Sequence, residues 1–323
     1  MPFTRRATLA LPALLAAPAL HAQPTTWAPS RPLRLIVTYP PGGVTDIVGR
    51  LVADPLGREL GQAVVVENRA GAGGNIGTQA AVQAEPDGYT LMLGTTALFG
   101  VNPILYTASG IDALRDLVPV GITGEAANVL SVLPRRVRAT TVAELVAEAK
   151  ARPLVYGSVG NGSSSHLSAL RFLQDFGIEA THVPYRGSAP LVAAMLANDV
   201  DFGFDTPATS TAHIRAGTFR ALAVTTAQRA SALPDVPTLK ESGLPDYDMG
   251  IWFGIFAPRR IPAPVATRLK QAMAAIRTPA QDERLRNAFV DPILVPEDRM
   301  QAYVESTAMA WQAIARAARI SAD

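Results

Sequence analysis

The chain has 323 residues, with 29 Lys and Arg against 27 Asp and Glu, and it contains no cysteine. A chain without cysteine has no disulfide, thiol nucleophile or thiolate metal site, and this length suggests two domains that each bury a hydrophobic core. If Arg5 and Arg6 belong to a cleaved leader, 29 − 2 = 27 cations face 27 anions, and this balance argues against a nucleic-acid binder with a basic face.

Residues 1–22 have the pattern of a secretory signal peptide. Arg5 and Arg6 give a basic start, residues 7–20 form an apolar stretch, and Ala22 supplies a small residue after which we expect cleavage. The apolar stretch is shorter than the roughly 20 residues that a membrane-spanning helix needs. We therefore expect an exported protein in the periplasm, with the choice between Sec and twin-arginine export left open.

Beyond the leader, short apolar runs alternate with amphipathic segments, which is typical of an α/β fold with mainly parallel sheets. The runs predict strands at residues 33–39, 63–67, 90–93, 129–133, 155–158, 180–183, 200–204, 222–225 and 251–257. The amphipathic segments predict helices at residues 46–60, 76–84, 142–151, 164–176, 189–198, 263–277, 281–288 and 297–318.

The first glycine turn, residues 39–46, lies between a predicted buried strand and a predicted helix start. The first N–H groups of a helix have no intrahelical partner and carry the positive end of the helix dipole, so such a start favours an anion. We expect Pro41, Gly42, Gly43 and Asp46 to form an anion-binding loop. A tight turn without a ligand is the alternative, with Asp46 then stabilising the first helical turn.

A different glycine-rich segment, residues 71–77, has some similarity to a dinucleotide fingerprint. Its third glycine falls one position late, and Glu67 precedes the turn where the fingerprint has an acidic residue after it. We interpret this segment as a structural turn and expect no nucleotide or other cofactor.

A second glycine-rich turn, residues 156–166, again follows a strand and begins a helix. Its serines can cap that helix and can also donate hydroxyl hydrogen bonds to a carboxylate. The candidate ligand-binding residues of this turn are Ser158, Gly162, Ser163, Ser164 and His166. A simple cap without a ligand is equally compatible with the sequence.

Further candidates follow the carboxyl ends of other predicted strands, where open α/β sheets bind ligands. They are Thr95, Thr96, Tyr185, Arg186, Gly187, Asp205 and Thr206. Ligand discrimination is expected around Thr95, Thr96, Ala97 and Phe99. Each residue alone is compatible with an ordinary loop, and their shared position is what groups them.

Catalytic and metal-binding patterns are weak in this sequence. Ser163, Ser164 and His166 are close in the chain, which leaves an exported serine hydrolase as an alternative, but no Gly-x-Ser-x-Gly turn surrounds them. His182 and His213 show no metal-ligand spacing. An exported scaffold that binds another protein is a third alternative, and it gives the glycine turns no purpose.

Two apolar runs that end in proline, residues 129–134 and 251–258, are typical of strands that cross between domains. They predict one discontinuous lobe of residues 23–130 plus 252–323, and an inserted second lobe of residues 131–251.

Together these motifs resemble the Bug receptors, the extracytoplasmic solute-binding proteins of tripartite tricarboxylate transport systems. The resemblance rests on segments spread over nearly the whole mature chain: residues 39–46, 64–74, 86–91, 160–167, 183–187, 234–238 and 252–258. It implies a two-lobed periplasmic binding protein fold, type II-like, whose lobes close on a small organic acid held by amides, hydroxyls and waters. It further implies a non-enzymatic receptor that acts with membrane transporter subunits, and by analogy a monomer.

Overall fold

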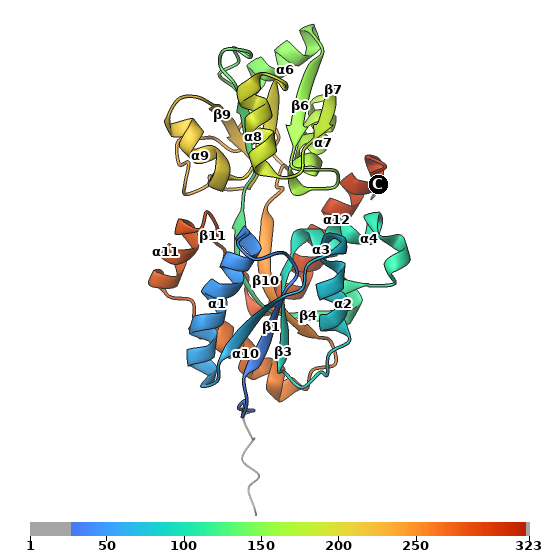
Figure 1. The fold of residues 1–323 in the computed structure, drawn as a ribbon, viewed down its shortest axis with the longest axis vertical. Coiled ribbons are helices and arrows are strands. Elements are labelled where there is room, and N and C mark those ends of the chain that lie inside the picture. The colour runs from blue at the N-terminus through green and yellow to red at the C-terminus, as the bar shows by residue number, and fades with distance from the viewer. Residues whose placement is uncertain (1–26, 321–323) are drawn as a thin grey trace, which may run out of the picture.

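Two separate β-sheets organise the residues that this computed structural model describes, 27–320 (Figure 1). We call each sheet with its helices a lobe. The predicted signal peptide, residues 1–22, lies outside the described residues. Within 27–320, no helix combines the length and the apolar character needed to cross a membrane.

The first lobe contains a six-stranded sheet in the order β11-β4-β10-β3-β1-β2. Its strands are β1 (Leu33–Val37), β2 (Val64–Asn68), β3 (Thr90–Thr95), β4 (Leu117–Ala126), β10 (Ile251–Pro258) and β11 (Asp291–Pro292). Its helices are α1 (Val44–Leu60), α2 (Asn75–Val82), α3 (Thr96–Gly100), α4 (Asn102–Leu105), α5 (Ala113–Asp116), α10 (Ala263–Ala275) and α11 (Pro279–Asn287), with the short 3-10 turns η1 (Ala72–Gly74), η2 (Thr107–Ser109) and η3 (Glu297–Arg299).

The two faces of this sheet bury different helices because successive side chains of a strand point to opposite faces. On β1, Leu35 and Val37 pack in one core cluster with α1, α10 and α11. Ile36 packs in the other cluster, with α2 and the short helices α3 and α5. The sheet is therefore covered on both faces, as the almost unbroken apolar sequence of β1 predicts.

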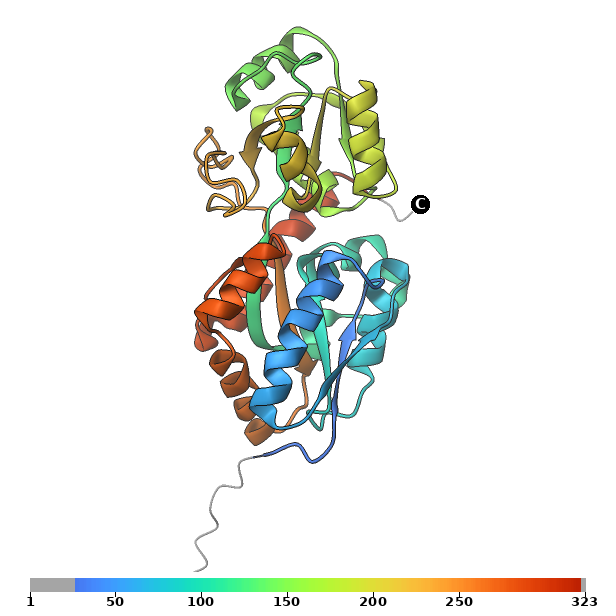
Figure 2. The same cartoon turned by 60° about the vertical axis from the view of Figure 1, so that its left-hand side comes forward.

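The second lobe contains a five-stranded sheet in the order β7-β6-β8-β5-β9. Its strands are β5 (Val129–Val132), β6 (Leu154–Ser158), β7 (Ala180–Pro184), β8 (Phe202–Asp205) and β9 (Arg220–Val224). Its helices are α6 (Val142–Ala151), α7 (Ser164–Phe176), α8 (Ser188–Ala197) and α9 (Pro207–Arg215). Figures 1 and 2 show this lobe above the first one.

The predicted two-lobed α/β fold is confirmed, and within it both sheets are mixed rather than mainly parallel. In the first sheet β1 pairs in parallel with β2 and β3, whereas β10 runs antiparallel to β3 and β4. In the second sheet β6 pairs in parallel with β7 and β8, whereas β5 runs antiparallel to β8 and β9. The cause is the connection between the lobes, because β5 and β10 follow a crossing of the chain and enter their sheets in the opposite direction.

The two crossings lie side by side and are joined by hydrogen bonds around Thr225. Its hydroxyl accepts a hydrogen bond from the Asn128 N–H at 2.8 Å, and its N–H donates to the Asn128 carbonyl at 3.0 Å. The Met249 N–H donates to the Thr225 carbonyl at 2.8 Å. Since β5 begins at Val129, the second sheet starts two residues before the predicted limit, and the full lobe limits stay a prediction.

A third connection is made by the C-terminal helix α12 (Met300–Ala317). Met300 and Val304 pack in the first lobe, while Trp311 and Ile314 belong to the main core cluster of the second lobe. In Figures 1 and 2 the end of α12 accordingly lies beside the second lobe. The final turns of this helix therefore belong by packing to the second lobe.

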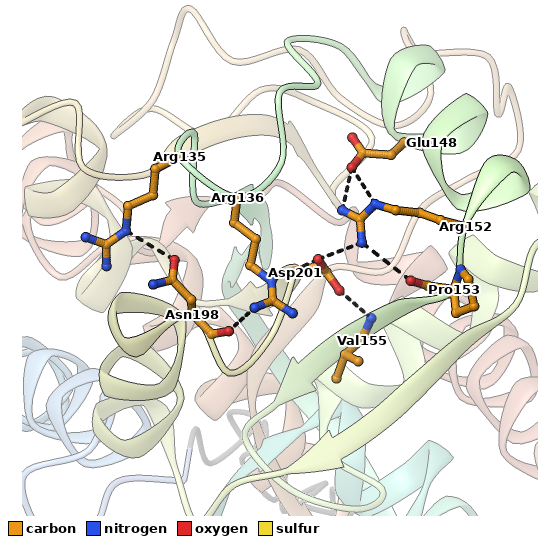
Figure 3. A network of polar contacts seen from close by, with 8 residues as sticks. All are labelled: Arg135, Arg136, Glu148, Arg152, Pro153, Val155, Asn198 and Asp201. Atoms are coloured by element: carbon orange, nitrogen blue, oxygen red, sulfur yellow. Dashed lines mark hydrogen bonds and ion pairs between the residues drawn. The ribbon is translucent and has the colours of Figure 1, made fainter.

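A buried carboxylate, Asp201, ties the second lobe together where β8 approaches β6 (Figure 3). Its oxygens accept hydrogen bonds from Arg136 at 2.9 Å, Arg152 at 3.1 Å and the Val155 N–H at 2.8 Å. Burial alone raises the pKa of Asp201, but these three hydrogen bonds outweigh it and hold the pKa below its ordinary value. The carboxylate is therefore charged and fully partnered at neutral pH.

Replacement of Asp201 by Asn gives Arg136, Arg152 and the Val155 N–H an uncharged amide oxygen as acceptor in place of a carboxylate. We expect D201N to lower the free energy of unfolding at pH 7 by about 2 to 4 kcal/mol, because breaking a buried, hydrogen-bonded ion pair is costly. Urea unfolding followed by circular dichroism measures this loss. The control is D175N, which removes the i,i+4 pair of Asp175 with Arg171 on α7 and is expected to cost at most about 1 kcal/mol. Equal effects of the two variants would contradict the assigned role of Asp201.

Candidate functional site

A cavity of about 340 Å³ lies between the two lobes. The first lobe contributes the beginnings of α1 and α3, together with parts of β10 and the segment after α11. The second lobe contributes the beginnings of α7 and α9. The cavity is therefore a place where a ligand touches both lobes at once, as the sequence predicts for a two-lobed receptor.

The start of α1 brings unpartnered backbone donors to this cavity. Val44 and Thr45 line it, and Gly43, the N-cap residue, makes no side-chain cap. The first backbone hydrogen bond of α1 runs from the Ile47 N–H to the Gly43 carbonyl at 3.0 Å. The N–H groups of Val44 and Thr45 therefore stay available to an acceptor, at the positive end of a helix of 17 residues.

Asp46 fixes the turn in front of α1 and does not reach the cavity lining. Its carboxylate is buried and accepts hydrogen bonds from the Gly42 N–H at 3.0 Å, Arg50 at 3.1 Å and Asn68 at 2.9 Å. Burial raises the pKa of Asp46, and the hydrogen bonds from Arg50, Gly42 and Asn68 more than compensate, so the pKa lies below its ordinary value. The charge that would repel an acid is thus neutralised by its own surroundings.

Pro41, Gly42 and Gly43, predicted as ligand-binding residues, are exposed and do not belong to the cavity lining. The reason is that Asp46 occupies the Gly42 N–H, while Gly42 has a φ of 86° that turns the chain into the helix. In this arrangement the amides next along the chain, those of Val44 and Thr45, take the position predicted for the glycines.

The start of α7 faces the cavity from the second lobe. Gly162, Ser163 and Ser164 line the cavity, as does Asn161. The Ser163 hydroxyl is used within the turn, since it donates to the Gly160 carbonyl at 2.6 Å and accepts from the His166 N–H at 3.2 Å. Neither the hydroxyl nor the backbone N–H of Ser164 has a hydrogen-bond partner within the described structure, so both are free for a ligand.

His166 and Ser158 hold this turn from behind. The Gly162 N–H donates to Nδ1 of His166 at 3.1 Å, and the His166 ring stacks on His182 with centroids 3.9 Å apart. Ser158 is fully buried, and its hydroxyl lies 2.7 Å from Nε2 of His182. Burial, together with the neighbouring His182, lowers the pKa of His166 to about 3, and burial lowers the pKa of His182 to about 4. Both rings are neutral at physiological pH.

This geometry does not form a serine–histidine pair for hydrolysis at the cavity. Nδ1 of His166 accepts a hydrogen bond from the Gly162 N–H. The Ser163 hydroxyl bonds to the backbone N–H of His166 and not to its ring, and Ser164 forms no hydrogen bond with His166. The Ser158–His182 contact is buried under the turn. The arrangement gives the serine hydrolase alternative no nucleophile activated by a base.

Thr95 and Thr96 line the cavity at the end of β3 and the start of α3. The Thr95 hydroxyl is buried and has no hydrogen-bond partner within the described residues. The Thr96 hydroxyl accepts from the Trp252 N–H at 2.9 Å and thereby attaches α3 to β10 close to the crossing. Thr95 therefore lines the cavity without an accessible hydroxyl, and Thr96 positions the wall of the cavity.

Tyr185, Arg186 and Asp205 lie outside the cavity lining. Tyr185 packs in a core cluster of the second lobe, and Arg186 is exposed. Asp205 is buried and accepts hydrogen bonds from Ser188 at 2.6 Å, Thr209 at 2.6 Å and the Thr206 N–H at 2.8 Å. Burial raises the pKa of Asp205, and these bonds oppose the rise. Asp205 thus fastens the beginnings of α8 and α9 next to the site.

Sequence reasoning missed more than half of the lining. The unpredicted residues are Tyr39, Val44, Thr45, Gly73, Asn102, Leu105, Tyr106, Ala126, Asn161, Ala208, Ile251, Phe253, Ala288, Phe289 and Trp311. Five of them lie next to predicted residues and share their signal, a strand end that leads into a helix: Tyr39, Val44, Thr45, Asn161 and Ala208. The remainder come from segments that only the fold brings to the cavity, such as α12 and the end of α11.

No Asp, Glu, Lys, Arg or His lines the cavity among the described residues. Its polar groups are hydroxyls, amides and helix-start N–H groups, and the rest of its wall is apolar. Such a site binds an anion by oriented dipoles, without a countercharge. Within residues 27–320 no group of three or more His, Asp or Glu side chains could hold a metal ion.

A family model described as "Tripartite tricarboxylate transporter family receptor" matches residues 48–320 of this chain. Protein BugT of Bordetella pertussis (strain Tohama I) is 34% identical to it over 292 residues, which cover 89% of each protein. Among solved structures, R. palustris Rpa4515 with adipate is 35% identical, with a TM-score of 0.76 over 90% of this chain and 98% of that one. MatC (Rpa3494) from Rhodopseudomonas palustris with bound malate is 27% identical, with a TM-score of 0.72 over 89% and 99%.

The neutral state of His166 predicts a pH dependence of stability. In the unfolded chain a histidine takes up a proton below about pH 6.5, whereas folded His166 stays neutral down to about pH 3. The free energy of unfolding therefore falls as the pH falls from about 6.5 towards 3, and at pH 5 His166 alone accounts for about 1 to 2 kcal/mol of the loss. Urea unfolding at pH 7.5 and pH 5 measures it.

The matched variant is H166N, whose side-chain oxygen can still accept the Gly162 N–H but does not titrate. We expect a smaller loss of stability between pH 7.5 and pH 5 in H166N than in the wild type. The same loss in both proteins would contradict a neutral His166 in the fold.

Proposed function

Because the chain belongs to the tripartite tricarboxylate transporter receptor family, of which the Bug proteins are members, we propose that its interlobe cavity captures a small organic carboxylate. The protein is a solute-binding receptor of this family. The carboxylate class is supported by two similar structures, one with adipate and one with bound malate. The proposal covers a dicarboxylate, an amino acid or an aromatic acid.

One observation carries the proposal: residues at helix starts in both lobes line the cavity, and their N–H groups have no acceptor within the described structure. Val44 and Thr45 present them from α1, and Ser164 presents one from α7, together with its hydroxyl. Hydrogen bonds from N–H groups to a carboxylate are short and strong because the acceptor is charged. A carboxylate between the lobes would receive such bonds from both sides, which an uncharged solute could not use as well.

In the proposed mechanism the ligand favours the closed arrangement of the lobes. A ligand that contacts α1 and α7 together binds better when the lobes are close, so it shifts the population towards that state. The paired crossings around Thr225 provide a narrow hinge for this motion. No covalent step is needed, and in our proposal the protein is not an enzyme and uses no cofactor.

We further propose that the closed, loaded protein delivers its solute in the periplasm to the membrane subunits of a tripartite tricarboxylate-type transporter, as a monomer. Of the predicted residues we assign Ser164 to the ligand as a donor, with Val44 and Thr45 added. Thr95, Gly162 and Ser163 shape the cavity wall, because their donors are buried or already used. Asp46, Ser158, His166 and Asp205 are assigned as positioning residues, because each binds a turn or a helix start beside the cavity.

A thermal-shift and calorimetric screen tests the ligand class. The panel is adipate, malate, 3-phenylpropanoate and glutamate, with adipamide as an uncharged analogue of adipate. We expect at least one acid to raise the Tm and bind with measurable heat, and adipamide to do neither, because it lacks the charge that the helix-start dipoles favour. Equal binding of adipate and adipamide would contradict carboxylate capture, and conversion of a bound acid to a product would favour an enzyme.

Proline at the first helical residue tests the backbone donors, because it removes the N–H without breaking the helix. Val44 and Ser164 occupy this position, and their N-cap residues have the extended ψ of 167° and 161° that a following proline requires. We expect V44P and S164P each to weaken the binding of the best acid by about 10- to 100-fold, since a hydrogen bond to a charged group contributes about 1.5 to 3 kcal/mol.

The control for S164P is S164A, which removes the hydroxyl but keeps the N–H. We expect a smaller loss of affinity for S164A than for S164P, with both variants unfolding cooperatively near the wild-type Tm. If S164P bound the acid as tightly as S164A, the assigned role of the backbone N–H would be wrong.

A further inference from the structure

Phe289 has a backbone conformation that aromatic residues rarely adopt. It follows α11 and has a φ of 60°, in the left-handed region. Its N–H donates to the Arg286 carbonyl at 2.9 Å, and the next N–H, of Val290, donates to the Leu285 carbonyl at 3.0 Å. This pair of hydrogen bonds is a Schellman motif, which normally has glycine at the position of Phe289.

Other helices of this chain follow that rule. Gly61 ends α1 with a φ of 72°, and Gly177 ends α7 with a φ of 60°. For a residue with a Cβ atom the left-handed conformation costs roughly 1 to 2 kcal/mol. A phenylalanine at this position is unfavourable for the helix end itself, and the gain from its side chain has to come from elsewhere.

The side chain of Phe289 lines the interlobe cavity. It is only half-buried, and its neighbours in the apolar part of the lining are Val44, Ile251, Phe253 and Ala288. Figures 1 and 2 show α11 beside α1, so the end of α11 lies on the same side of the cavity as the donors of Val44 and Thr45. A ligand whose carboxylate meets those donors would place its uncharged body within reach of this wall.

The loop that carries Phe289 is also fixed from the second lobe. Asp291, two residues further on, belongs to β11 and accepts a hydrogen bond from the Ser231 N–H at 3.1 Å. Ser231 lies in the loop between β9 and β10. The position of the Phe289 ring therefore depends on both lobes, like the cavity that it lines.

We infer that Phe289 is a specificity-determining residue that selects acids with an aromatic or extended hydrocarbon body over short, hydroxylated ones. This inference rests on the proposed function, because it assigns the uncharged part of the same ligand. Two features support it: a strained backbone that is retained at a glycine position, and a cavity wall without any Asp, Glu, Lys, Arg or His among the described residues. The apolar part of this wall, which includes Ile251, Phe253 and Phe289, favours a hydrocarbon surface over a hydroxylated one.

The variant F289G separates ligand contact from structure, because glycine adopts the left-handed conformation without strain. Calorimetry with 3-phenylpropanoate, adipate and malate measures the effect. We expect wild-type protein to bind 3-phenylpropanoate or adipate more tightly than malate, and F289G to weaken those two acids about tenfold or more, with malate changed by less than about twofold. The Tm of F289G should stay within about 3 °C of the wild type, since relief of strain offsets lost packing.

Two further variants complete the test. F289Y keeps the ring and should retain the wild-type preference. N198G replaces another left-handed residue, Asn198 with a φ of 68°, at the end of α8 and outside the cavity lining, and should leave all affinities unchanged.

The outcomes distinguish this inference from the proposed function. Wild-type binding of acids with an unchanged or uniformly reduced affinity in F289G would overturn the role of Phe289 and leave the receptor function standing. A wild-type preference for malate would have the same effect. Wild-type protein that binds no acid at all would overturn the proposed function, and the role of Phe289 with it.

Discussion

Backbone N–H groups at helix starts, which lie at the positive ends of helix dipoles, meet at the interlobe cavity, and the surrounding structure preserves them. Each turn that precedes such a start satisfies its own polar groups from behind, Gly42 through Asp46 and Gly162 through His166. The next amides, of Val44 and Ser164, are left without a protein acceptor. Rigid, partnered turns therefore hold unpartnered donors in place, so little entropy is lost when an anion binds.

The same arrangement explains why acidic residues lie so close to a site for acids. Asp46 and Asp205 are buried beside the cavity, yet each accepts three hydrogen bonds from surrounding turns, helices and strands. A carboxylate whose acceptors are filled projects little field towards a second carboxylate a helix turn away. Asp46 and Asp205 therefore position the helix starts beside the cavity. The sequence shows only that an aspartate is present, so it does not distinguish this positioning role from direct contact with the ligand.

Local sequence patterns were sufficient for the elements that carry the site and insufficient for its walls. The helices at residues 142–151 and 164–176 match α6 and α7, because a cap and an amphipathic stripe define both ends. β4 was not predicted, since Pro119, Gly121 and Gly124 interrupt its apolar run. The close packing of Met273 and β11 requires these glycines, because a Cβ atom would lie 2.8 Å from Met273 at Gly121 and 2.6 Å from the Asp291 carbonyl at Gly124. The antiparallel entry of β5 and β10, and the arrival of Trp311 and Phe289 at the cavity, depend on long-range packing that no local pattern contains.

This division between local and long-range information bears on specificity. Main-chain donors after glycine turns are encoded by motifs that many receptors can share, so they define an anion site and leave the rest of the solute unspecified. Discrimination must then come from side chains that later segments bring to the cavity, such as the ends of α11 and α12. These segments can change without disturbing the turns, because they contribute no backbone donor to the helix starts. A receptor scaffold built in this way keeps its anion site constant while its choice of solute varies, and the retained strain at Phe289 is the residue-level sign of that choice in this chain.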